Sequence, residues 1–281
     1  MFKLALIQMQ VRGGCKAANL DRAEALVRAA AESHARMVLL PEAMPLGWTH
    51  SSSFNEAEPI PGGATCERLR ALARDLKIYL CSGLIELASD QRTFNSAVLI
   101  DPEGELLLHH RKLNELQIAH DFYAQGDRLQ VAHTPLGTIG LMICADAFAP
   151  RQIISRSLGY MGADVILSPS AWAVPADHDN AREPYGQLWI DHYAPVARDF
   201  QLWIAGASNV GWIEGGPWHG RKCIGCSLVI DPAGQVAARG PYGVDAETIL
   251  YVDIEPQPRP ARGEGWRTFW GYKDASSPPA E

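Results

Sequence analysis

The chain of 281 residues contains no long apolar run and no basic stretch. No segment approaches the roughly 18–20 consecutive apolar residues that a membrane-spanning helix requires. Residues 1–9 are apolar, but this stretch is too short for a signal peptide and lacks a cleavage pattern. Lys and Arg number 25 against 32 Asp and Glu, a formal net charge of −7, which argues against a nucleic-acid-binding surface. These absences predict a soluble, cytoplasmic protein with neither nucleic-acid nor membrane partners.

Cysteine is also sparse, with six residues in the whole chain. Six cysteines in a chain of this length, with no export signal, indicate reduced thiols rather than a disulfide framework. Two of them form a Cys-x-x-Cys motif at 223–226, a spacing found in zinc and redox sites. No second Cys/His pair lies at ligand spacing, and the motif runs directly into an apolar strand rather than a helix. The sequence therefore predicts no metal site.

Short apolar runs, typical of strands, alternate with segments of helical periodicity. Strands are expected at 2–9, 37–40, 78–86, 93–101, 106–111, 129–132, 138–143, 163–170, 202–209, 220–230, 235–239 and 248–254. Helices are expected at 23–30 (capped by Asn19 or Asp21), 64–76, 151–161 and 187–199. This order predicts a mixed α/β sandwich with helices covering the sheets. No linker divides the chain, so we expect one domain over 1–255 and an extended tail over 256–281.

Three of the predicted strands end at a chemically reactive side chain. Glu42 follows the strand at 37–40, which Pro41 ends, while Lys112 and Cys144 follow the strands at 106–111 and 138–143. Each has an ordinary reading by itself, as a surface carboxylate, a surface lysine and a small core residue. Together, a base, a cation and a thiol are what a cysteine hydrolase needs for proton removal, oxyanion stabilisation and nucleophilic attack.

Three segments resemble, in order, the signature segments of the nitrilase superfamily of carbon–nitrogen hydrolases. They read Leu-Leu-Pro-Glu at 39–42, His-Arg-Lys-Leu at 110–113 and Gly-Leu-Met-Ile-Cys-Ala-Asp at 140–146. The resemblance continues at 95–97, 101–104, 162–170 and 208–211 and covers roughly residues 3–255. It implies a four-layer αββα sandwich with mixed sheets, usually assembled into dimers or larger homo-oligomers. It also implies hydrolysis of a small amide, carbamoyl amine or nitrile without metal or cofactor.

Carried over residue by residue, the resemblance assigns three catalytic roles. Cys144 is the nucleophile, Glu42 the general base that takes its proton, and Lys112 the charge that stabilises the tetrahedral intermediate. The backbone N–H of Ala145 completes the oxyanion hole. A thiol of pKa about 8.5 is mostly protonated at neutral pH, so a nearby base or cation is needed to activate it. Attack gives a thioester and releases ammonia or an amine, and water activated by Glu42 then releases the acid.

The sequence departs from the family pattern after the lysine. Many members carry a second glutamate there, which orients the substrate, but the matching offset falls on residues 118–120. Glu115 or His120 is expected to take its place. Asp146 is expected to hold loops by hydrogen bonding. Further candidates for the substrate pocket lie a few residues past the reactive strands, namely Trp48, Phe148, Ser170 and Trp172.

Two rival functions remain open at this point. Cys144 is followed by Ala-Asp rather than by the Trp-Glu typical of true nitrilases, which favours an amide or N-carbamoyl amide substrate. A true nitrilase that acts on a C≡N bond with the same residues is the first alternative. A non-catalytic binding relative is the second, and the presence of all three reactive residues argues against it.

Overall fold

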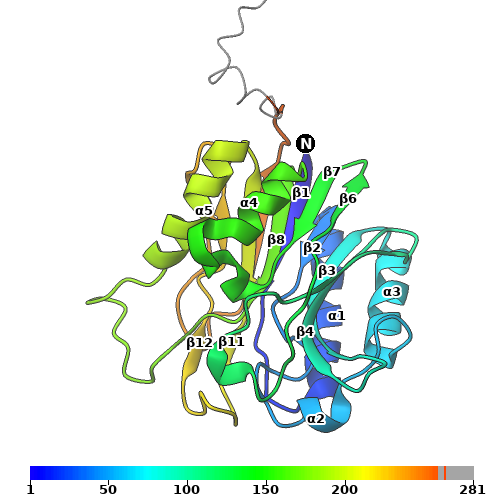
Figure 1. The fold of residues 1–281 in the computed structure, drawn as a ribbon, viewed down its shortest axis with the longest axis vertical. Helices are drawn as coiled ribbons and strands as arrows, with labels where there is room; N and C mark the ends of the chain where they lie inside the picture. The colour runs from blue at the N-terminus through cyan, green and yellow to red at the C-terminus, as the bar shows by residue number, and fades with distance from the viewer. Residues whose placement is uncertain (259–262, 264–281) are drawn as a thin grey trace, which may run out of the picture.

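Two six-stranded mixed sheets pack face to face, with helices on their outer faces (Figure 1). This arrangement is seen in a computed structural model that describes residues 1–258 and 263. The first sheet has the order β15 (Thr248–Ile254), β1 (Phe2–Gln8), β2 (Met37–Leu39), β3 (Tyr79–Leu87), β4 (Thr93–Ile100) and β5 (Leu106–Arg111). The second has the order β14 (Val236–Arg239), β13 (Leu228–Ile230), β10 (Trp203–Ser208), β8 (Val165–Ser170), β7 (Gly137–Leu141) and β6 (Val131–Thr134).

The helices form the two outer layers of the sandwich. Helices α1 (Lys16–Glu32) and α3 (Ala64–Leu76) cover the first sheet, while α4 (Ile153–Tyr160) and α5 (Gln187–Phe200) cover the second (Figure 1). Short elements complete the chain: α2 (Ser53–Glu56), η1 (Gln117–Ala119), η2 (Cys144–Phe148), η3 (Pro150–Gln152) and the small sheet β11 (Val210–Trp212), β12 (Lys222–Ile224), β9 (Ala173–Val174). The predicted four-layer αββα sandwich with mixed sheets is confirmed.

Apolar side chains between the two sheets, together with those between the second sheet and its helices, form the largest of the buried clusters. A second cluster lies between the first sheet and its helices. Alternate residues of a strand point to opposite faces of a sheet. On β4, Ala97 and Leu99 therefore belong to the inner cluster, while Val98 and Ile100 belong to the cluster under the helices. This alternation decides which polar side chains reach the space between the sheets.

Two local predictions are wrong. The first helix begins at Lys16 rather than near residue 23, and Asn19 lies inside it instead of capping it. The Asn19 side chain bonds the backbone of Arg12 and Pro45, a use that helical periodicity does not reveal. The stretch 220–230 is not one strand, because the chain turns at Cys226, where φ is 58°. β12 joins the small sheet and β13 joins the second large sheet.

The structure contributes two further observations on the sequence predictions. No helix in the described part of the chain is long and apolar enough to cross a bilayer. Apart from residues 256–258 and 263, the predicted tail from 256 lies outside the described residues.

Candidate active site

Strand ends from both large sheets meet in the interior. β2 ends at Leu39 and the chain turns at Pro41, so Glu42 lies just beyond the strand. The backbone N–H of Glu42 donates to the carbonyl of Ser170 at the end of β8 in the other sheet (3.2 Å). Gly83 on β3 lets the turn lie this close, because a Cβ there would come 2.6 Å from the Cα of Glu42. The close approach fixes the glutamate at the junction of the two sheets.

Glu42 and Lys112 form a buried ion pair. The Nζ atom of Lys112 lies 2.7 Å from Oε1 of Glu42, and the two residues are 1% and 2% exposed, respectively. Lys112 follows the last residue of β5, and its backbone N–H donates to the carbonyl of Asn95 on β4 (2.9 Å). The pairing of β4 with β5 therefore fixes where the ammonium group lies.

A second carboxylate shares the lysine. Oε1 of Glu115 accepts a hydrogen bond from Nζ of Lys112 (3.0 Å), and Glu115 is 5% exposed. The Asn95 side-chain amide donates to both carboxylates, at 2.7 Å from Glu42 and 3.1 Å from Glu115. His120 is exposed, and its Nε2 lies 3.3 Å from the backbone oxygen of Glu115. The structure thus brings Glu115, and not His120, to the lysine.

Cys144 lies on a sharp turn after β7. Its φ of 42° falls in the left-handed region, which is unfavourable for a residue with a Cβ. The residue is 8% exposed, and the Glu42 carboxylate and the backbone of Ala171 lie beside its thiol and act on it. Burial, together with the neighbouring carboxylate, raises the pKa of the Cys144 thiol well above its ordinary value. At neutral pH the thiol is therefore protonated and needs a base.

The charges around the thiol are strongly coupled. Burial raises the pKa of the Glu42 carboxyl, Glu115 adds to that effect, and Lys112 opposes it. For Lys112, burial acts to lower the pKa, but the charges of Glu42 and Glu115 outweigh it and the pKa is raised well above its ordinary value. The lysine therefore stays charged, while Glu42 is a stronger base than an exposed carboxylate. A strengthened base and a fixed cation thus flank a protonated thiol.

Helix η2 begins at Cys144 itself. Ala145 is its second residue, and backbone N–H groups in the first turn of a helix have no partner within that helix. An N–H group of this kind can donate a hydrogen bond to a negatively charged oxygen. The Ala145 N–H therefore offers a second donor, beside Lys112, for negative charge that develops next to Cys144.

Asn95 belongs to this cluster, although the sequence does not predict it as a site residue. Residues 95–97 contribute only to the family resemblance. Two signals point to it. An asparagine in a buried strand needs partners for its side-chain NH₂ group inside the protein. Strand pairing also places it beside Lys112. Its use as a common donor to two carboxylates requires the three-dimensional arrangement.

The structure places the aromatic pocket candidates in two groups. Trp172 is 1% exposed and stacks on Trp189, with ring centroids 4.4 Å apart. Phe148 contacts the same ring at 4.5 Å, so these two candidates pack together beside the second sheet. Trp48 lies in a different cluster, which includes Ala171, a neighbour of the Cys144 thiol. Ser170 contributes its carbonyl to Glu42, while its hydroxyl bonds the backbone of β8.

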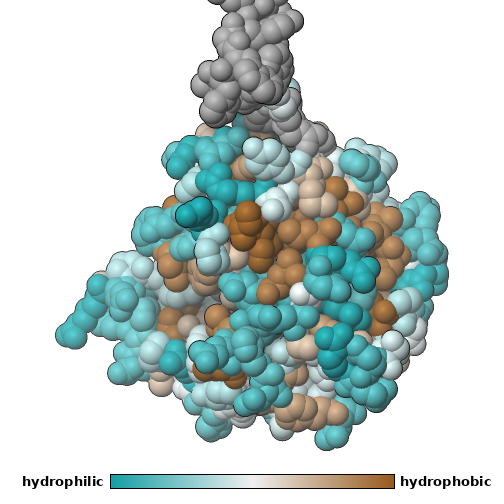
Figure 2. All heavy atoms as spheres, viewed as in Figure 1, coloured by the Kyte–Doolittle hydropathy of each residue, from teal (hydrophilic) through white to brown (hydrophobic). Residues whose placement is uncertain are grey.

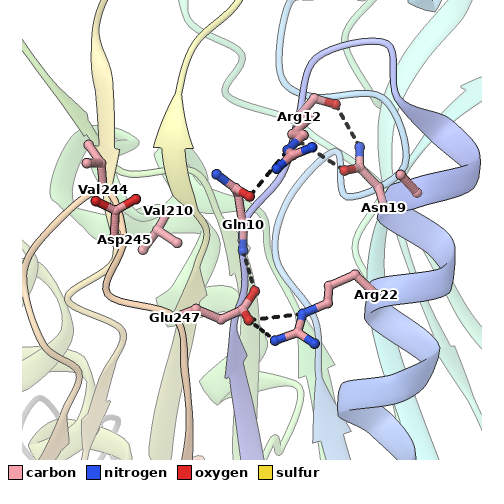
Figure 3. Close-up of a pocket in the computed structure, with 9 residues that line it drawn as sticks. Gln10, Arg12, Asn19, Arg22, Val210, Val244, Asp245 and Glu247 are labelled. Atoms are coloured by element: carbon pink, nitrogen blue, oxygen red, sulfur yellow. Dashed lines mark hydrogen bonds and ion pairs between the residues drawn. The ribbon is translucent and has the colours of Figure 1, made fainter.

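A cavity of about 430 Å³ lies elsewhere, between the first turns of α1 and the segment that enters β15 (Figure 3). There Glu247 accepts the backbone N–H of Gln10 (3.0 Å) and pairs with Arg22. Its lining residues are Gln10, Arg12, Ala18, Asn19, Arg22, Val210, Val244, Asp245 and Glu247, none of them a predicted site residue. Among residues 1–258 and 263, no three His, Cys, Asp or Glu side chains group so as to hold a metal ion.

Comparison with known proteins identifies relatives along most of the chain. Residues 3–260 match the family model described as carbon-nitrogen hydrolase. The chain is 34% identical over 272 residues to omega-amidase NIT2 of Mus musculus, covering 90% of this chain and 88% of the relative. It is 30% identical over 258 residues to a nitrilase of Pyrococcus abyssi, covering 90% of each.

A solved structure of an amidase from Nesterenkonia sp. AN1 shows the same fold, with a TM-score of 0.74, 25% identity and 90% coverage of each chain. That protein is a glutamate-to-glutamine mutant with the acetamide moiety of fluoroacetamide covalently added at the active-site cysteine. The family match spans both sheets and all three strand-end residues. The chain belongs to the carbon–nitrogen hydrolase family of the nitrilase superfamily, as its three signature segments predicted.

Proposed function

We propose that this enzyme hydrolyses the C–N bond of a small amide or N-carbamoyl amide through a thioester on Cys144. The observation that carries the proposal is the position of Glu42, whose buried carboxylate lies beside the Cys144 thiol and bonds the Lys112 ammonium group. A base beside the nucleophile and a cation bonded to the base are the parts that acyl transfer to a thiol requires.

The first half of the reaction forms the acyl-enzyme. Glu42 takes the proton of the Cys144 thiol as Sγ attacks the amide carbon. Lys112 and the Ala145 N–H then stabilise the negative charge on the carbonyl oxygen. As the intermediate collapses, protonated Glu42 gives its proton to the leaving nitrogen, the C–N bond breaks and ammonia or an amine departs. The acyl group remains as a thioester.

The second half returns the enzyme to its starting state. A water molecule loses a proton to Glu42 and attacks the thioester carbon, and the same two donors stabilise the new oxyanion. The C–S bond then breaks, the thiol of Cys144 is reprotonated from Glu42 and the carboxylic acid is released. The raised pKa of the Glu42 carboxyl suits a group that both accepts and donates a proton.

Glu115 is proposed as the replacement for the family's second glutamate. It bonds Nζ of Lys112 and shares the Asn95 amide with Glu42, so it lies where it can orient both the lysine and the substrate nitrogen. His120 is not given this role, because it contacts only the backbone of Glu115.

The choice of an amide over a nitrile rests on the relatives. The mouse relative is named an omega-amidase, and the solved relative is named an amidase and carries an acetamide-derived adduct. The Pyrococcus abyssi relative is named a nitrilase, which keeps nitrile hydrolysis as the second candidate. Of these activities, amide hydrolysis is the one named for both the relative of higher identity and the solved relative.

Ammonia release from a panel of small amides, N-carbamoyl amines and nitriles tests the proposal. We expect turnover of amides by the wild type, an acyl adduct on Cys144 in the intact mass, and loss of both in a folded Cys144→Ala variant. Unchanged turnover in that variant would exclude Cys144 as the nucleophile. Turnover of nitriles alone would favour the second candidate.

Self-association is a further part of the proposal, as a homodimer or larger homo-oligomer. Apolar side chains are exposed on α4 and α5, among them Ile153, Tyr160 and Leu188 at 58%, 67% and 52%. In Figure 2, apolar side chains also gather beside these helices, in the middle of the view. Exposed apolar patches of this kind mark interaction surfaces. Light scattering after size exclusion should give at least twice the monomer mass, and a monomer would contradict the proposal.

We also propose that residues 1–255 form the hydrolase domain, since β15 ends at Ile254. A cytoplasmic location remains a proposal, supported by the six cysteines, all of which are free thiols. Free thiols persist in a reducing compartment.

A further inference from the structure

Asp146 is a fully buried carboxylate for which the proposed chemistry has no step. It is 0% exposed and accepts four hydrogen bonds. Oδ2 accepts the backbone N–H of Ile143 and the Nε2 of His110, both at 2.8 Å. Oδ1 accepts the backbone N–H groups of Leu113 at 3.0 Å and Asn114 at 2.7 Å. The donors come from two segments that are distant in sequence.

These donors lie in the two chain segments that carry the proposed oxyanion donors, Lys112 and the Ala145 N–H. Ile143 immediately precedes Cys144, and Leu113 and Asn114 immediately follow Lys112. A second link runs in parallel, since the Asn114 side chain donates to the carbonyl of Ala145 (2.6 Å). The lysine follows a strand of the first sheet, and the nucleophile follows a strand of the second. One carboxylate therefore ties together the two chain segments that must act on the same substrate oxygen.

The register of β5 places the His110 side chain beside Asp146. His110 pairs with Ala97 of β4, which belongs to the cluster between the sheets, and it is 4% exposed. Lys112, two residues later, points to the same side. Burial would raise the pKa of the Asp146 carboxyl, but His110 and the bonded backbone N–H groups hold it below its ordinary value. The carboxylate is thus charged and fixed.

We infer that Asp146 and His110 are a positioning pair that sets Lys112 and the Ala145 N–H against the carbonyl oxygen of the substrate. The inference rests on the proposed function and adds two residues to it. Neither residue touches the reacting atoms. Their effect is to hold the two oxyanion donors in one geometry, and misplacement of such donors by about 1 Å lowers the rate by about 10²-fold.

Asp146→Asn is the sharpest test, because it keeps the shape and removes acceptors. Both oxygens of Asp146 face N–H donors, so either orientation of the asparagine points its NH₂ group at two of them. We expect kcat for an amide to fall about 10²-fold, with KM changed by less than about threefold. Alkylation of Cys144 by iodoacetamide should slow by less than about threefold, because that reaction forms no oxyanion.

A matched pair at His110 keeps the test usable if Asp146→Asn fails to fold. His110→Gln retains an N–H donor near the place of Nε2 and should keep kcat within about threefold, while His110→Leu should lose about tenfold or more. Asp164→Asn is the structural control, because Asp164 is another buried carboxylate that bonds a backbone N–H, that of Thr138. It should lower stability and leave kcat unchanged.

The outcomes separate this inference from the proposed function. Loss of amide turnover with retained alkylation in Asp146→Asn or His110→Leu supports the positioning pair. Equal losses of turnover and alkylation, or kcat unchanged in both variants, would overturn it. If Cys144→Ala retains turnover, the proposed function itself fails. If Cys144→Ala is inactive while Asp146→Asn and His110→Leu both keep their kcat, only the positioning pair is wrong.

Discussion

Two buried glutamates of the first sheet differ in their hydrogen-bond donors and in the direction of their pKa shifts. Glu86 lies on β3 and Glu42 just after β2, and they are 1% and 2% exposed. Each pairs with a cation from the end of β5, Glu86 with Arg111 and Glu42 with Lys112. Because Arg111 and Lys112 are adjacent in an extended segment, they point to opposite faces of the sheet. The sheet thus carries two glutamate–cation pairs built from neighbouring residues.

Hydrogen-bond donors surround the Glu86 carboxylate. The carboxylate accepts hydrogen bonds from Arg111 (2.5 and 3.0 Å), His109 (2.8 Å) and Ser96 (2.6 Å). Burial alone would raise the pKa of the Glu86 carboxyl, but these donors lower it to about 2. A planar guanidinium that bonds both oxygens favours a permanent ion pair. Glu86 is therefore a structural anion.

The Glu42 carboxylate shares its hydrogen-bond donors with a second carboxylate, that of Glu115. Lys112 is divided between Glu42 and Glu115, and the Asn95 amide is divided in the same way. Burial then prevails and the pKa of the Glu42 carboxyl is raised. Burial and a cation therefore do not by themselves decide the pKa of a glutamate. The number of donors per carboxylate separates the fixed ion pair of Glu86 from the proposed base Glu42.

The largest difference is expected from replacing each glutamate by glutamine. Glu42→Gln removes the proposed base, and kcat/KM for an amide should fall by about 10³-fold. Glu86→Gln leaves the thiol and its base in place, and kcat/KM should stay within about threefold. Steady-state ammonia release measures both variants. Equal losses in the two would show that the carboxylates do not differ in role.

The next largest effect is expected from exchanging the cations. Lys112→Arg places a broad planar group where a compact ammonium lies between two carboxylates, and kcat should fall about 10²-fold. Arg111→Lys, the matched change on the other face, should lower the unfolding midpoint with little loss of kcat. The assay is ammonia release combined with thermal unfolding. Full activity in Lys112→Arg would contradict a positional role for the lysine.

Glu86→Gln should also reveal the pH range over which the Glu86 pair stabilises the fold. Its folded pKa of about 2 lies below the ordinary value of 4.5. The stabilisation is therefore complete above the ordinary value and is lost as the pH falls through the folded one. We expect the variant to lose about 2 kcal/mol of unfolding free energy at pH 7. Urea unfolding from pH 7 towards pH 3 should show this difference shrinking, and a constant difference would contradict the assignment.

The smallest effect is expected from Glu115→Gln. Glu115 is among the groups that raise the pKa of the Glu42 carboxyl, so its neutralisation should lower that pKa. A base is active when deprotonated, so the acid limb of the kcat/KM profile should move to lower pH. Loss of one of the two charged partners of Lys112 should reduce kcat by about tenfold. A limb that stays in place would show that Glu115 does not act on Glu42.

Much of the fold and several residues of the candidate site follow from the sequence for physical reasons. Apolar strands that end in Pro-Glu, in Lys and in Cys indicate which side chains lie at the carboxyl ends of strands, where sheets of this kind gather reactive groups. The strand order and its resemblance to a family predict the layers. The ends of helices and strands are harder to predict from sequence. The start of α1 is an example, because Asn19 bonds the backbone of Arg12 and Pro45 instead of capping the helix.

Other features depend on contacts that no local pattern encodes. Glu115 lies three residues after Lys112 and away from the family offset, so its position follows from the path of the loop. Asn95 and Asp146 join segments from different strands, and nothing in their neighbourhood in sequence names their partners. The pKa difference between Glu42 and Glu86 likewise requires a count of donors in three dimensions.

The central claim is that Glu42 is the base that takes the proton of Cys144. The rate of alkylation of Cys144 by iodoacetamide at pH 7, with intact-mass readout, tests it most directly because this reaction needs the thiolate but no substrate. We predict that Glu42→Gln slows alkylation by about 10²-fold, because loss of the proton acceptor outweighs the lower pKa that the Cys144 thiol has without the neighbouring carboxylate charge. Glu86→Gln should leave the alkylation rate unchanged. Equal rates in the wild type and in a folded Glu42→Gln variant would contradict it.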